Sequence, residues 1–410
     1  MRLSNSLLVH PGLAILFATS SLAHSPSQVL LPKPTGKYHV GLSIAELIDS
    51  SRTQPFLQDI EPIKLMISVF YPVSHEHHTS PVPYMPPETA LIEDNYLSSD
   101  IYGLASPNGT FEKVALQLVD GEHLTSKDSC EEEQEYPLII FMPGEGTTRL
   151  FYSQIASTIA SKGYTVVTID APYDVDVVQY TDGSFAFFNF TLWNSTDQET
   201  ALAIANLAVE TRMGDVSFVL DSLSNKTFAQ SLIPNLPSSG LNTTHTAMFG
   251  HSLGGVTAYS ILEVEDRILG GLNMDGSLVG PGVFGSPNGT SKPFMLMGHA
   301  GHNLTSDDPF PVSSWAIAWS ELTGWKRDIE VADTGHYDFS DYPIVFEKLG
   351  ITPTNQTILD KVLIGSMKGE RALETVTTYV GAFLDFVIRG KSSDLLDGPV
   401  KEFPEVTFNY

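Results

Sequence analysis

The pattern G-x-S-x-G at residues 250–254, with Ser252 at its centre, constrains the fold more than any other stretch of this sequence. An apolar run suited to a buried strand precedes it, and a run of small apolar residues suited to a helix packed on a sheet follows it. A serine in this context sits on a sharp strand-to-helix turn with strained backbone angles. Side chains at Gly250 and Gly254 would clash with the neighbouring strand and helix. The pattern predicts that Ser252 is a catalytic nucleophile.

Strand-like and helix-like patterns alternate along the chain from residue 137 onward. This rhythm predicts the α/β class, with a mostly parallel central sheet and helices on both faces. Buried strands are expected at residues 137–142, 164–170, 267–274, 293–298 and 328–332. Helices are expected at residues 151–162, 197–223 and 370–389.

Residues 177–190 have the pattern of a β-hairpin with Asp182-Gly183 as its turn. The aromatic run from Phe185 to Trp193 is expected to pack inward as the second strand of that hairpin. The alternative is a lid that contacts lipid.

The first 23 residues are typical of a secretory signal peptide. Arg2 provides a positive start, residues 13–22 are apolar but too short to span a bilayer, and Ser21-Leu22-Ala23 fits a cleavage site. A mature chain starting at His24 is expected, with an N-terminal membrane anchor as the alternative.

Two further segments are expected in the mature chain. Residues 24–62 are rich in proline, and from His24 to Glu61 we expect an irregular arm. Residues 63–71 alternate between apolar and polar, as in a strand. They would begin a catalytic domain that covers residues 63–410.

Eight of the fourteen asparagines begin the glycosylation pattern N-x-[ST] without proline. A secreted glycoprotein accounts for this number better than chance does. The pattern occurs at Asn108, Asn189, Asn194, Asn225, Asn242, Asn288, Asn303 and Asn355.

The formal net charge of −26 disfavours nucleic acids and anionic membrane surfaces as partners. No stretch beyond the signal peptide is long and apolar enough for membrane insertion.

Cys130 is the only cysteine, which excludes an intrachain disulfide framework and a cysteine-based metal site. His75, His77 and His78 have no carboxylates at ligand spacing, so we expect a solvated turn there. Neither a metal nor a cofactor is predicted, and the sequence leaves the oligomeric state open.

A serine nucleophile needs a neighbouring base, and that base needs an orienting carboxylate. In this fold class the chain order is serine, acid, histidine, with the last two on loops after later strands. Asp275 ends a predicted strand 23 residues after Ser252 and is the candidate acid. The alternative is an aspartate that caps a helix or a turn.

Three histidines follow Asp275 and could be the base: His299, His302 and His336. We favour His336, because it follows a predicted strand directly and has a glycine beside it, as a protruding loop requires. His299 and His302 lie one strand earlier and are expected to be loop or pocket-lining residues.

The oxyanion formed in such a reaction needs preorganised N–H donors. The amide of Leu253, directly after the nucleophile, is one candidate. The other is the amide of Glu145, in the glycine-rich segment Pro143-Gly144-Glu145-Gly146-Thr147 that follows the strand at 137–142. The alternative for this segment is a plain turn. No catalytic role is assigned to the Glu145 side chain.

Taken together, these motifs resemble those of the plasma-type platelet-activating factor acetylhydrolases, and more closely their secreted fungal relatives. The resemblance runs from about residue 63 to 390 and is carried by Phe70-Tyr71-Pro72, the segments 141–149 and 250–255, Asn273-Met-Asp-Gly276, and Gly335-His336. It implies an α/β-hydrolase fold and 1-alkyl-2-acetylglycerophosphocholine esterase activity. It also implies the triad Ser252, Asp275 and His336, with the amides of Glu145 and Leu253 as the oxyanion hole. Pro143 departs from the animal enzymes, which have histidine there.

The sequence therefore predicts a secreted, metal-independent serine esterase whose substrate is a phospholipid with a short sn-2 acyl chain. One alternative is a general carboxylesterase or a cutinase-like hydrolase of polyesters. Another, from a different class, is an inactive glycoprotein binding module on the same fold.

Overall fold

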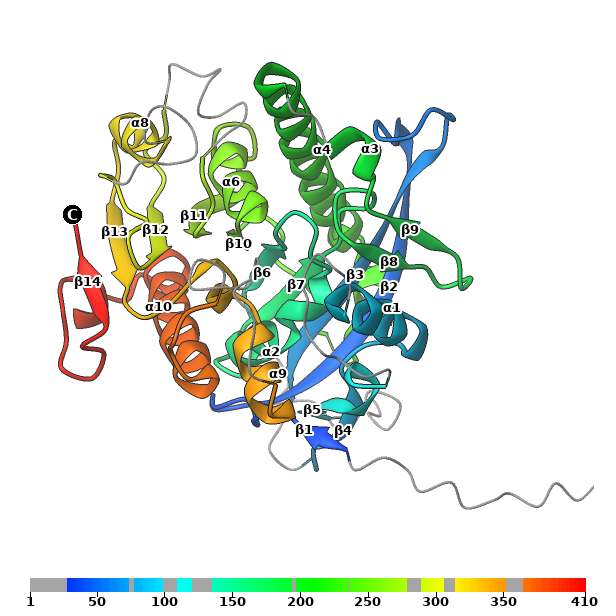
Figure 1. Ribbon diagram of the computed structural model, residues 1–410, viewed down its shortest axis with the longest axis horizontal. Coiled ribbons are helices and arrows are strands. Elements are labelled where there is room, and N and C mark those ends of the chain that lie inside the picture. Colours follow the sequence, from blue (N-terminus) through cyan, green and yellow to red (C-terminus); the bar gives the residue numbers. More distant parts are fainter. Residues whose placement is uncertain are drawn as a thin grey trace, which may run out of the picture.

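Figure 1 shows the computed structural model of the protein, which describes residues 28–73, 77–98, 109–119, 135–193, 197–234, 236–278, 289–305, 314–351 and 364–410. Several predictions lie outside the described residues. They concern the signal peptide, Cys130, His75 and the glycosylation sites at Asn108, Asn194, Asn288 and Asn355.

In the described part of the chain, nine strands form the central sheet, and the predicted mostly parallel arrangement is confirmed. Six of them, β6, β7 and β10 to β13, are parallel to one another, while β2, β3 and β14 run antiparallel to their neighbours. In spatial order they are β14 (Val406–Phe408), β13 (Lys326–Val331), β12 (Phe294–His299), β11 (Ile268–Met274), β10 (Thr246–His251), β6 (Leu138–Met142), β7 (Thr165–Ile169), β3 (Pro62–Val73) and β2 (His39–Thr53).

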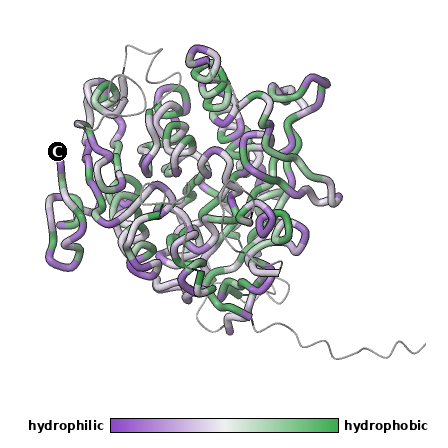
Figure 2. Tube along the Cα trace, in the orientation of Figure 1, coloured by the Kyte–Doolittle hydropathy of each residue, from purple (hydrophilic) through white to green (hydrophobic). Residues whose placement is uncertain are grey.

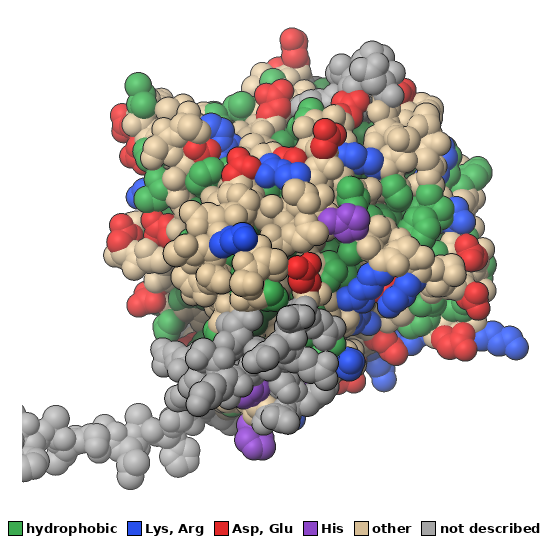
Figure 3. Space-filling view, turned by 180° about the vertical axis from the view of Figure 1, so that it is seen from behind, with side chains coloured by type: hydrophobic (Ala, Val, Ile, Leu, Met, Phe, Trp, Pro, Cys, Tyr) green, Lys and Arg blue, Asp and Glu red, His purple; other side chains and the backbone are tan. Residues whose placement is uncertain are grey.

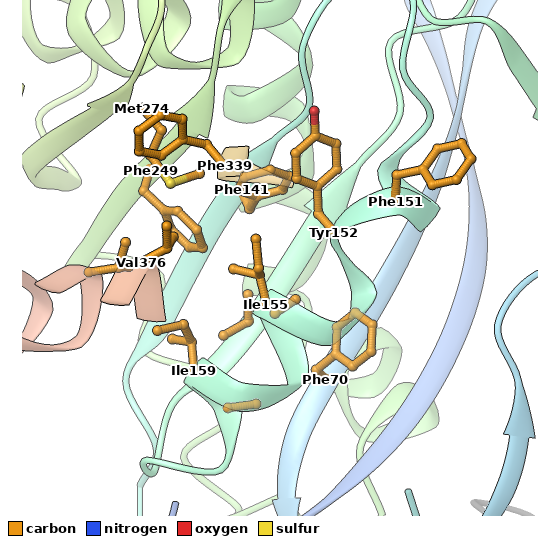
Figure 4. Packing of buried hydrophobic residues seen from close by; sticks show 14 of the residues in the cluster. Phe70, Phe141, Phe151, Tyr152, Ile155, Ile159, Phe249, Met274, Phe339 and Val376 are labelled. Carbon is orange, nitrogen blue, oxygen red and sulfur yellow. The ribbon is translucent and has the colours of Figure 1, made fainter. Parts of the chain in front are cut away.

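Helices cover both faces of this sheet (Figure 1) because successive residues of each buried strand point to opposite faces. In β6, Phe141 packs in a cluster with α2 (Ser153–Ala160), α9 (Tyr342–Leu349) and α10 (Gly369–Arg389). Its neighbour Met142 packs in a second cluster with α4 (Gln198–Ser224), α6 (Leu253–Ser260) and α8 (Ser314–Glu321). Figure 4 shows part of the first cluster, in which Ile155 and Ile159 of α2 lie beside the aromatic rings of the sheet.

Smaller elements surround this core. Strands β1 (Val29–Leu30), β5 (Val114–Leu118) and β4 (Ser80–Pro83) form a separate small sheet. Three shorter helices are α1 (Pro87–Ser98), α3 (Phe190–Trp193) and α5 (Lys226–Leu232). Leu97 of α1 packs in the first cluster, and Leu232 of α5 packs in the second. Two 3₁₀ turns matter for the site: η3 (Arg149–Tyr152) and η5 (His336–Phe339).

The expected irregular arm is wrong for residues 39–53, which form β2. This strand of 15 residues pairs antiparallel with β3 and is the edge of the central sheet. Burial along this strand does not follow the polarity of its side chains. Ile44 and Ile48 are about half exposed, whereas Asp49 is buried. Asp49 is held by an ion pair with Arg52, which also bonds Asp215 of α4. Backbone pairing with β3, the buried side chains of Val40 and Leu47, and the ion pair of Asp49 therefore hold this strand in place together.

The predicted hairpin is confirmed as β8 (Val177–Gln179) and β9 (Phe185–Phe187), which pair antiparallel. Gly183 has a φ of +82°, the left-handed conformation that this turn needs. The expectation that the aromatic run packs inward is wrong for Phe187 and Phe190, which are 46% and 52% exposed. Within β9, Ala186 is buried, Phe185 is half-buried and Phe187 is exposed.

The long helix predicted at 197–223 is α4, and its start is set by Asp197, whose carboxylate accepts a hydrogen bond from the Thr200 amide. In Figure 2, α4 changes between hydrophilic and hydrophobic colours along its length, as expected for a helix with one face on the core. No helix among the described residues has the length and apolar character needed to cross a membrane. On the face shown in Figure 3, Lys and Arg side chains lie interspersed with Asp and Glu.

Candidate active site

Ser252 occupies the sharp turn between β10 and α6, as its sequence context predicts. Its φ of +53° is rare for a residue with a side chain and indicates a strained turn. A Cβ atom on Gly250 would lie 2.3 Å from the backbone of Gly254, and one on Gly254 would lie 2.1 Å from the carbonyl oxygen of Met142. The steric reason for both glycines is therefore confirmed.

Asp275 follows β11, the strand next to β10, and it also has a positive φ, +58°. Its carboxylate accepts a hydrogen bond of 2.6 Å from Nδ1 of His336 in η5. Because Nδ1 carries the proton in this contact, neutral His336 keeps its lone pair on Nε2, the form that a general base needs. The structure thus brings together the predicted acid and the predicted base from positions 61 residues apart.

The same carboxylate also binds the other two candidate histidines, which the sequence did not indicate. Nδ1 of His299 lies 2.7 Å from one carboxylate oxygen of Asp275, and Nδ1 of His302 lies 2.8 Å from the same oxygen. The main-chain amide of His299 donates to that oxygen as well, over 2.9 Å. His299 and His302 are therefore more than the expected loop or pocket-lining residues, because both rings donate hydrogen bonds to the predicted acid.

These donors explain the charge state of Asp275. Burial alone would raise its pKa, but the hydrogen bonds from His299, His302 and His336 outweigh burial and hold the pKa well below its usual value. Asp275 is therefore an anion at neutral pH. Trp315 stacks on His302 with ring centroids 4.2 Å apart and so fixes the orientation of that ring.

Asp275, His299 and His302 also place one possible metal-ligand atom each within 4.8 Å of one another. The Nδ1 atoms of both histidines already face the carboxylate as donors, and a protonated nitrogen has no lone pair for a metal. A metal ion bound through those atoms would have to displace the hydrogen bonds that keep Asp275 ionised.

Arg212, a fully buried residue of α4, holds the segment with the predicted oxyanion donor Glu145 in place through hydrogen bonds. Its guanidinium binds both carboxylate oxygens of Asp174, at 2.6 and 2.8 Å. It also donates to the carbonyl oxygens of Pro143, at 2.6 Å, and of Gly144, at 3.4 Å. In a trans peptide the C=O and N–H groups point in opposite directions, so the Gly144 contact sets the direction of the Glu145 amide.

The other predicted donor, the amide of Leu253, is at the first residue of α6, where N–H groups have no partner within the helix. The two segments lie close together, since a Cβ atom on Gly144 would be 3.2 Å from Cβ of Ser252. The segment that contains Glu145 and the start of α6 thus both lie beside the predicted nucleophile.

His251, directly before the nucleophile, is a residue that the sequence reasoning missed. Its Nε2 donates to the carbonyl oxygen of His336 over 2.9 Å, and its Nδ1 accepts from the hydroxyl of Tyr152 over 2.8 Å. The same hydroxyl accepts the Gly144 amide at 3.2 Å. Figure 4 shows the Tyr152 hydroxyl pointing away from the apolar cluster that holds its ring. Burial lowers the pKa of His251 well below its usual value, so the ring stays neutral.

A pocket of about 220 Å³ adjoins these groups. Glu145 and Gly146 of the oxyanion segment form one part of its wall, and Tyr337, next to His336, forms another. The rest of the lining comes from α1, from Asp176, from Tyr342 of α9 and from the segment around α3.

The four predicted glycosylation sites within the described residues differ in accessibility. Asn225 and Asn242 are exposed. Asn189 and Asn303 are half-buried, and their side-chain amide nitrogens donate hydrogen bonds to the Phe56 carbonyl and the Glu330 carboxylate. Since a glycan would be attached to that nitrogen, Asn225 and Asn242 are the more accessible of the predicted acceptors.

Comparison with known proteins adds to this geometry. A relative from Arthroderma benhamiae, named "Probable 1-alkyl-2-acetylglycerophosphocholine esterase", is 31% identical over 422 residues, which cover 98% of this chain and 100% of that protein. Among solved structures, a ferulic acid esterase from Streptomyces cinnamoneus is similar with a TM-score of 0.74 and 26% identity, covering 94% of this chain and 100% of that one.

The sheet, its helices and these relatives agree on an α/β-hydrolase fold and on a carboxylic ester hydrolase. A family model described as "Platelet-activating factor acetylhydrolase, isoform II" matches residues 23–352. The chain therefore belongs to the platelet-activating factor acetylhydrolase family.

Proposed function

We propose that this protein is a secreted, N-glycosylated serine esterase that hydrolyses short sn-2 acyl esters of phospholipids. Ser252 attacks the ester carbonyl, His336 takes the serine proton and later returns it to the leaving alcohol, and Asp275 stabilises the charged imidazole. The amides of Glu145 and Leu253 stabilise the oxyanion. Water then hydrolyses the acyl-enzyme, with His336 again acting as the base.

One observation carries this proposal: the carboxylate of Asp275 holds Nδ1 of His336 at 2.6 Å at the strand end next to the strained turn of Ser252. Hydrogen-bonded carboxylate, imidazole and strained serine are the parts that acyl transfer requires. The burial of Asp275 and its lowered pKa favour an orienting role over proton transfer by the carboxylate itself.

The choice of a short acyl chain rests on charge and on the name of the relative. The net charge of −26 does not favour adsorption to anionic lipid, so substrate is taken mainly as dissolved monomers. Each added CH₂ favours the lipid phase by about 0.8 kcal/mol, which selects short chains. The Arthroderma relative is named for a 2-acetyl substrate.

The test is a series of p-nitrophenyl esters from acetate to palmitate, together with 2-acetyl and 2-palmitoyl glycerophosphocholines. We expect kcat/KM to fall steeply with chain length. Faster turnover of palmitoyl substrates, or a jump in rate once an interface forms, would contradict the proposal and indicate a lipase.

A second candidate substrate class is the esters of aromatic acids. It is favoured by the similarity to the ferulic acid esterase and by the aromatic side chains in the pocket beside the oxyanion segment. Methyl ferulate, assayed beside p-nitrophenyl acetate and a 2-acetyl phospholipid, separates the two. Preferential hydrolysis of methyl ferulate would favour this second class.

Secretion is tested separately. Peptide N-glycosidase should lower the apparent mass of protein collected from the culture medium in several steps. An unchanged mass, or retention of the protein in the cell, would remove this part of the proposal and leave the chemistry untouched.

A further inference from the structure

The pocket of about 220 Å³ beside the oxyanion segment has an unusual lining. Among the described residues that form it are three carboxyl groups and five aromatic side chains, and none is basic. Its volume is below the roughly 300–1,000 Å³ typical of sites for drug-sized ligands, so it suits one group of a larger substrate.

We propose that this pocket binds an organic cation, specifically the quaternary ammonium group on the alcohol part of the ester substrate. The lining of the pocket by itself supports a cation site. The assignment of that cation to the ester substrate rests on the function proposed above.

Two of the carboxyl groups form a buried pair. Glu93 of α1 is 1% exposed and Asp176 is 8% exposed, and their side chains are hydrogen-bonded to each other. Burial, together with the other carboxyl group, raises the pKa of Glu93 well above its usual value, and burial raises the pKa of Asp176 to about 7. Among the described residues, Oε1 of Glu93 has no hydrogen-bond partner. A buried charge without a counter-ion is costly, and an entering cation would offset that cost.

The neighbouring charged groups do not neutralise this pair. Arg149 is ion-paired with Asp170, and Arg212 with Asp174, so both cations are already matched. Asp94, on the same helix as Glu93, accepts hydrogen bonds from three main-chain amides. The local charge of the pocket is therefore negative whenever its carboxyl groups are ionised.

Glu145 adds the third carboxyl group, at the boundary with the catalytic groups. Part of its side chain is exposed to solvent. Desolvation by the surrounding protein and the negative charge of Asp174 raise the pKa of its carboxyl group to about 7, while Arg212 acts in the opposite direction. Its main-chain amide is the predicted oxyanion donor. A cation beside this side chain would therefore lie close to the reacting ester.

The aromatic side chains suit the same ligand. The negative face of an aromatic ring attracts a cation within about 6 Å of the ring centre, and quaternary ammonium groups are bound in this way. Tyr342 stacks on Phe151 with centroids 4.3 Å apart and meets the edge of Tyr337 at 5.4 Å, so these rings are held in place. Phe188 and Phe190, 4.9 Å apart, line the pocket from the α3 side.

The test is calorimetric titration of the full-length protein at pH 8 with choline and with 3,3-dimethylbutan-1-ol, its uncharged analogue of the same shape. We expect choline to bind about tenfold more tightly, because only choline gains the charge and cation–π contributions. Equal affinity for the two compounds, or no binding of choline, would overturn the proposal.

Variants assign the binding to this pocket. Asp176→Asn and Tyr342→Leu should each raise the Kd for choline about tenfold and change that for the alcohol less. Glu88→Gln, which removes the same charge from α1 outside the pocket, is the matched control and should leave both constants unchanged. Choline binding that survives in both pocket variants would place the site elsewhere and refute the assignment. Melting curves identify a variant that has failed to fold, and Tyr96→Leu then replaces it.

The pH dependence gives an independent readout. Asp176 and Glu145, with pKa values of about 7, gain charge between pH 6 and pH 8. Choline should therefore bind several-fold more tightly at pH 8 than at pH 6, while the affinity for the alcohol stays the same. A choline Kd that does not change with pH would contradict the involvement of these carboxyl groups.

Hydrolysis of 2-acetyl phospholipids with choline or glycerol head groups separates this inference from the proposed function. If choline binds in the pocket but neither lipid is hydrolysed, the cation site stands and the substrate proposal fails. If both lipids are hydrolysed at equal rates and choline does not bind, the esterase proposal stands and the cation site is refuted.

Discussion

The ring of His251 donates a hydrogen bond from Nε2 to the main-chain carbonyl oxygen of His336, over 2.9 Å. The residue before the predicted nucleophile therefore holds the backbone of the predicted base. Through Tyr152, the same ring is connected to the amide of Gly144 in the oxyanion segment. One neutral, fully buried imidazole thus sets the relative positions of three parts of the site.

Replacing His251 tests this role. His251→Phe should lower kcat about 10- to 100-fold with little change in KM, because a displacement of about 1 Å at reacting groups has effects of that size. His251→Gln keeps a donor for the His336 carbonyl and should recover part of the loss. An unchanged kcat in His251→Phe would show that His336 is held in place without this ring.

Arg212 fastens the oxyanion segment and offers a second test. Arg212→Lys keeps the positive charge that the buried Asp174 needs but cannot reproduce the fork that reaches both the carboxylate and the main-chain carbonyls. We expect kcat to fall about tenfold or more. Arg267→Lys is the control, since Arg267 also contacts both carboxylate oxygens of an acid, Glu265, at a more exposed position before β11. Equal effects of the two changes would show a general loss of stability rather than a role in the site.

The three histidines around Asp275 should differ sharply. His336→Ala should lower kcat by a factor of about 10⁴ to 10⁶, as Ser252→Ala should, because members of a triad act as a unit. His299→Ala and His302→Ala should each cost about tenfold, because each removes only part of the hydrogen bonding that keeps Asp275 ionised. An inactive His302→Ala beside an active His336→Ala would show that the base has been assigned wrongly.

Stability should depend on pH in a direction set by buried acids. Burial raises the pKa of Asp341 and of Asp176 to about 7. Both groups bind protons more readily in the folded than in the unfolded protein, so stability rises as pH falls through 7. From pH 8 to 6.5 we expect a gain of about 1–2 kcal/mol, seen as a Tm higher by a few degrees. Below pH 6.5 the lowered pKa of His251 acts in the opposite direction. A Tm that falls between pH 8 and 6.5 would contradict this account.

The parts of the fold that the sequence predicted are those with a local signal. The alternation of buried strands and helices, the hairpin at 177–190 and the strand-to-helix turn of Ser252 all rest on residues close in the chain. Asp275 and His336 were predicted because each follows a strand of a parallel sheet, and the ends of such strands meet at one edge.

The features that were missed depend on contacts between distant segments. β2 pairs with β3 along its length, although Ile44 and Ile48 are half exposed and the buried Asp49 depends on an ion pair with Arg52. The contacts of His251 with His336 and of Arg212 with Gly144 span 85 and 68 residues. One sequence signal could have pointed to Arg212: it is the one arginine of the long helix α4, which packs on the core. A charge in such a position needs a partner, because an unpaired buried charge is strongly destabilising.

The most direct test of the account is mass spectrometry of the protein after reaction with a fluorophosphonate. We predict a single adduct on the peptide that contains Ser252, absent in Ser252→Ala and slowed by at least about a thousandfold in His336→Ala. An adduct on another residue, or labelling of Ser252→Ala at the normal rate, would contradict the assignment of Ser252 as the nucleophile.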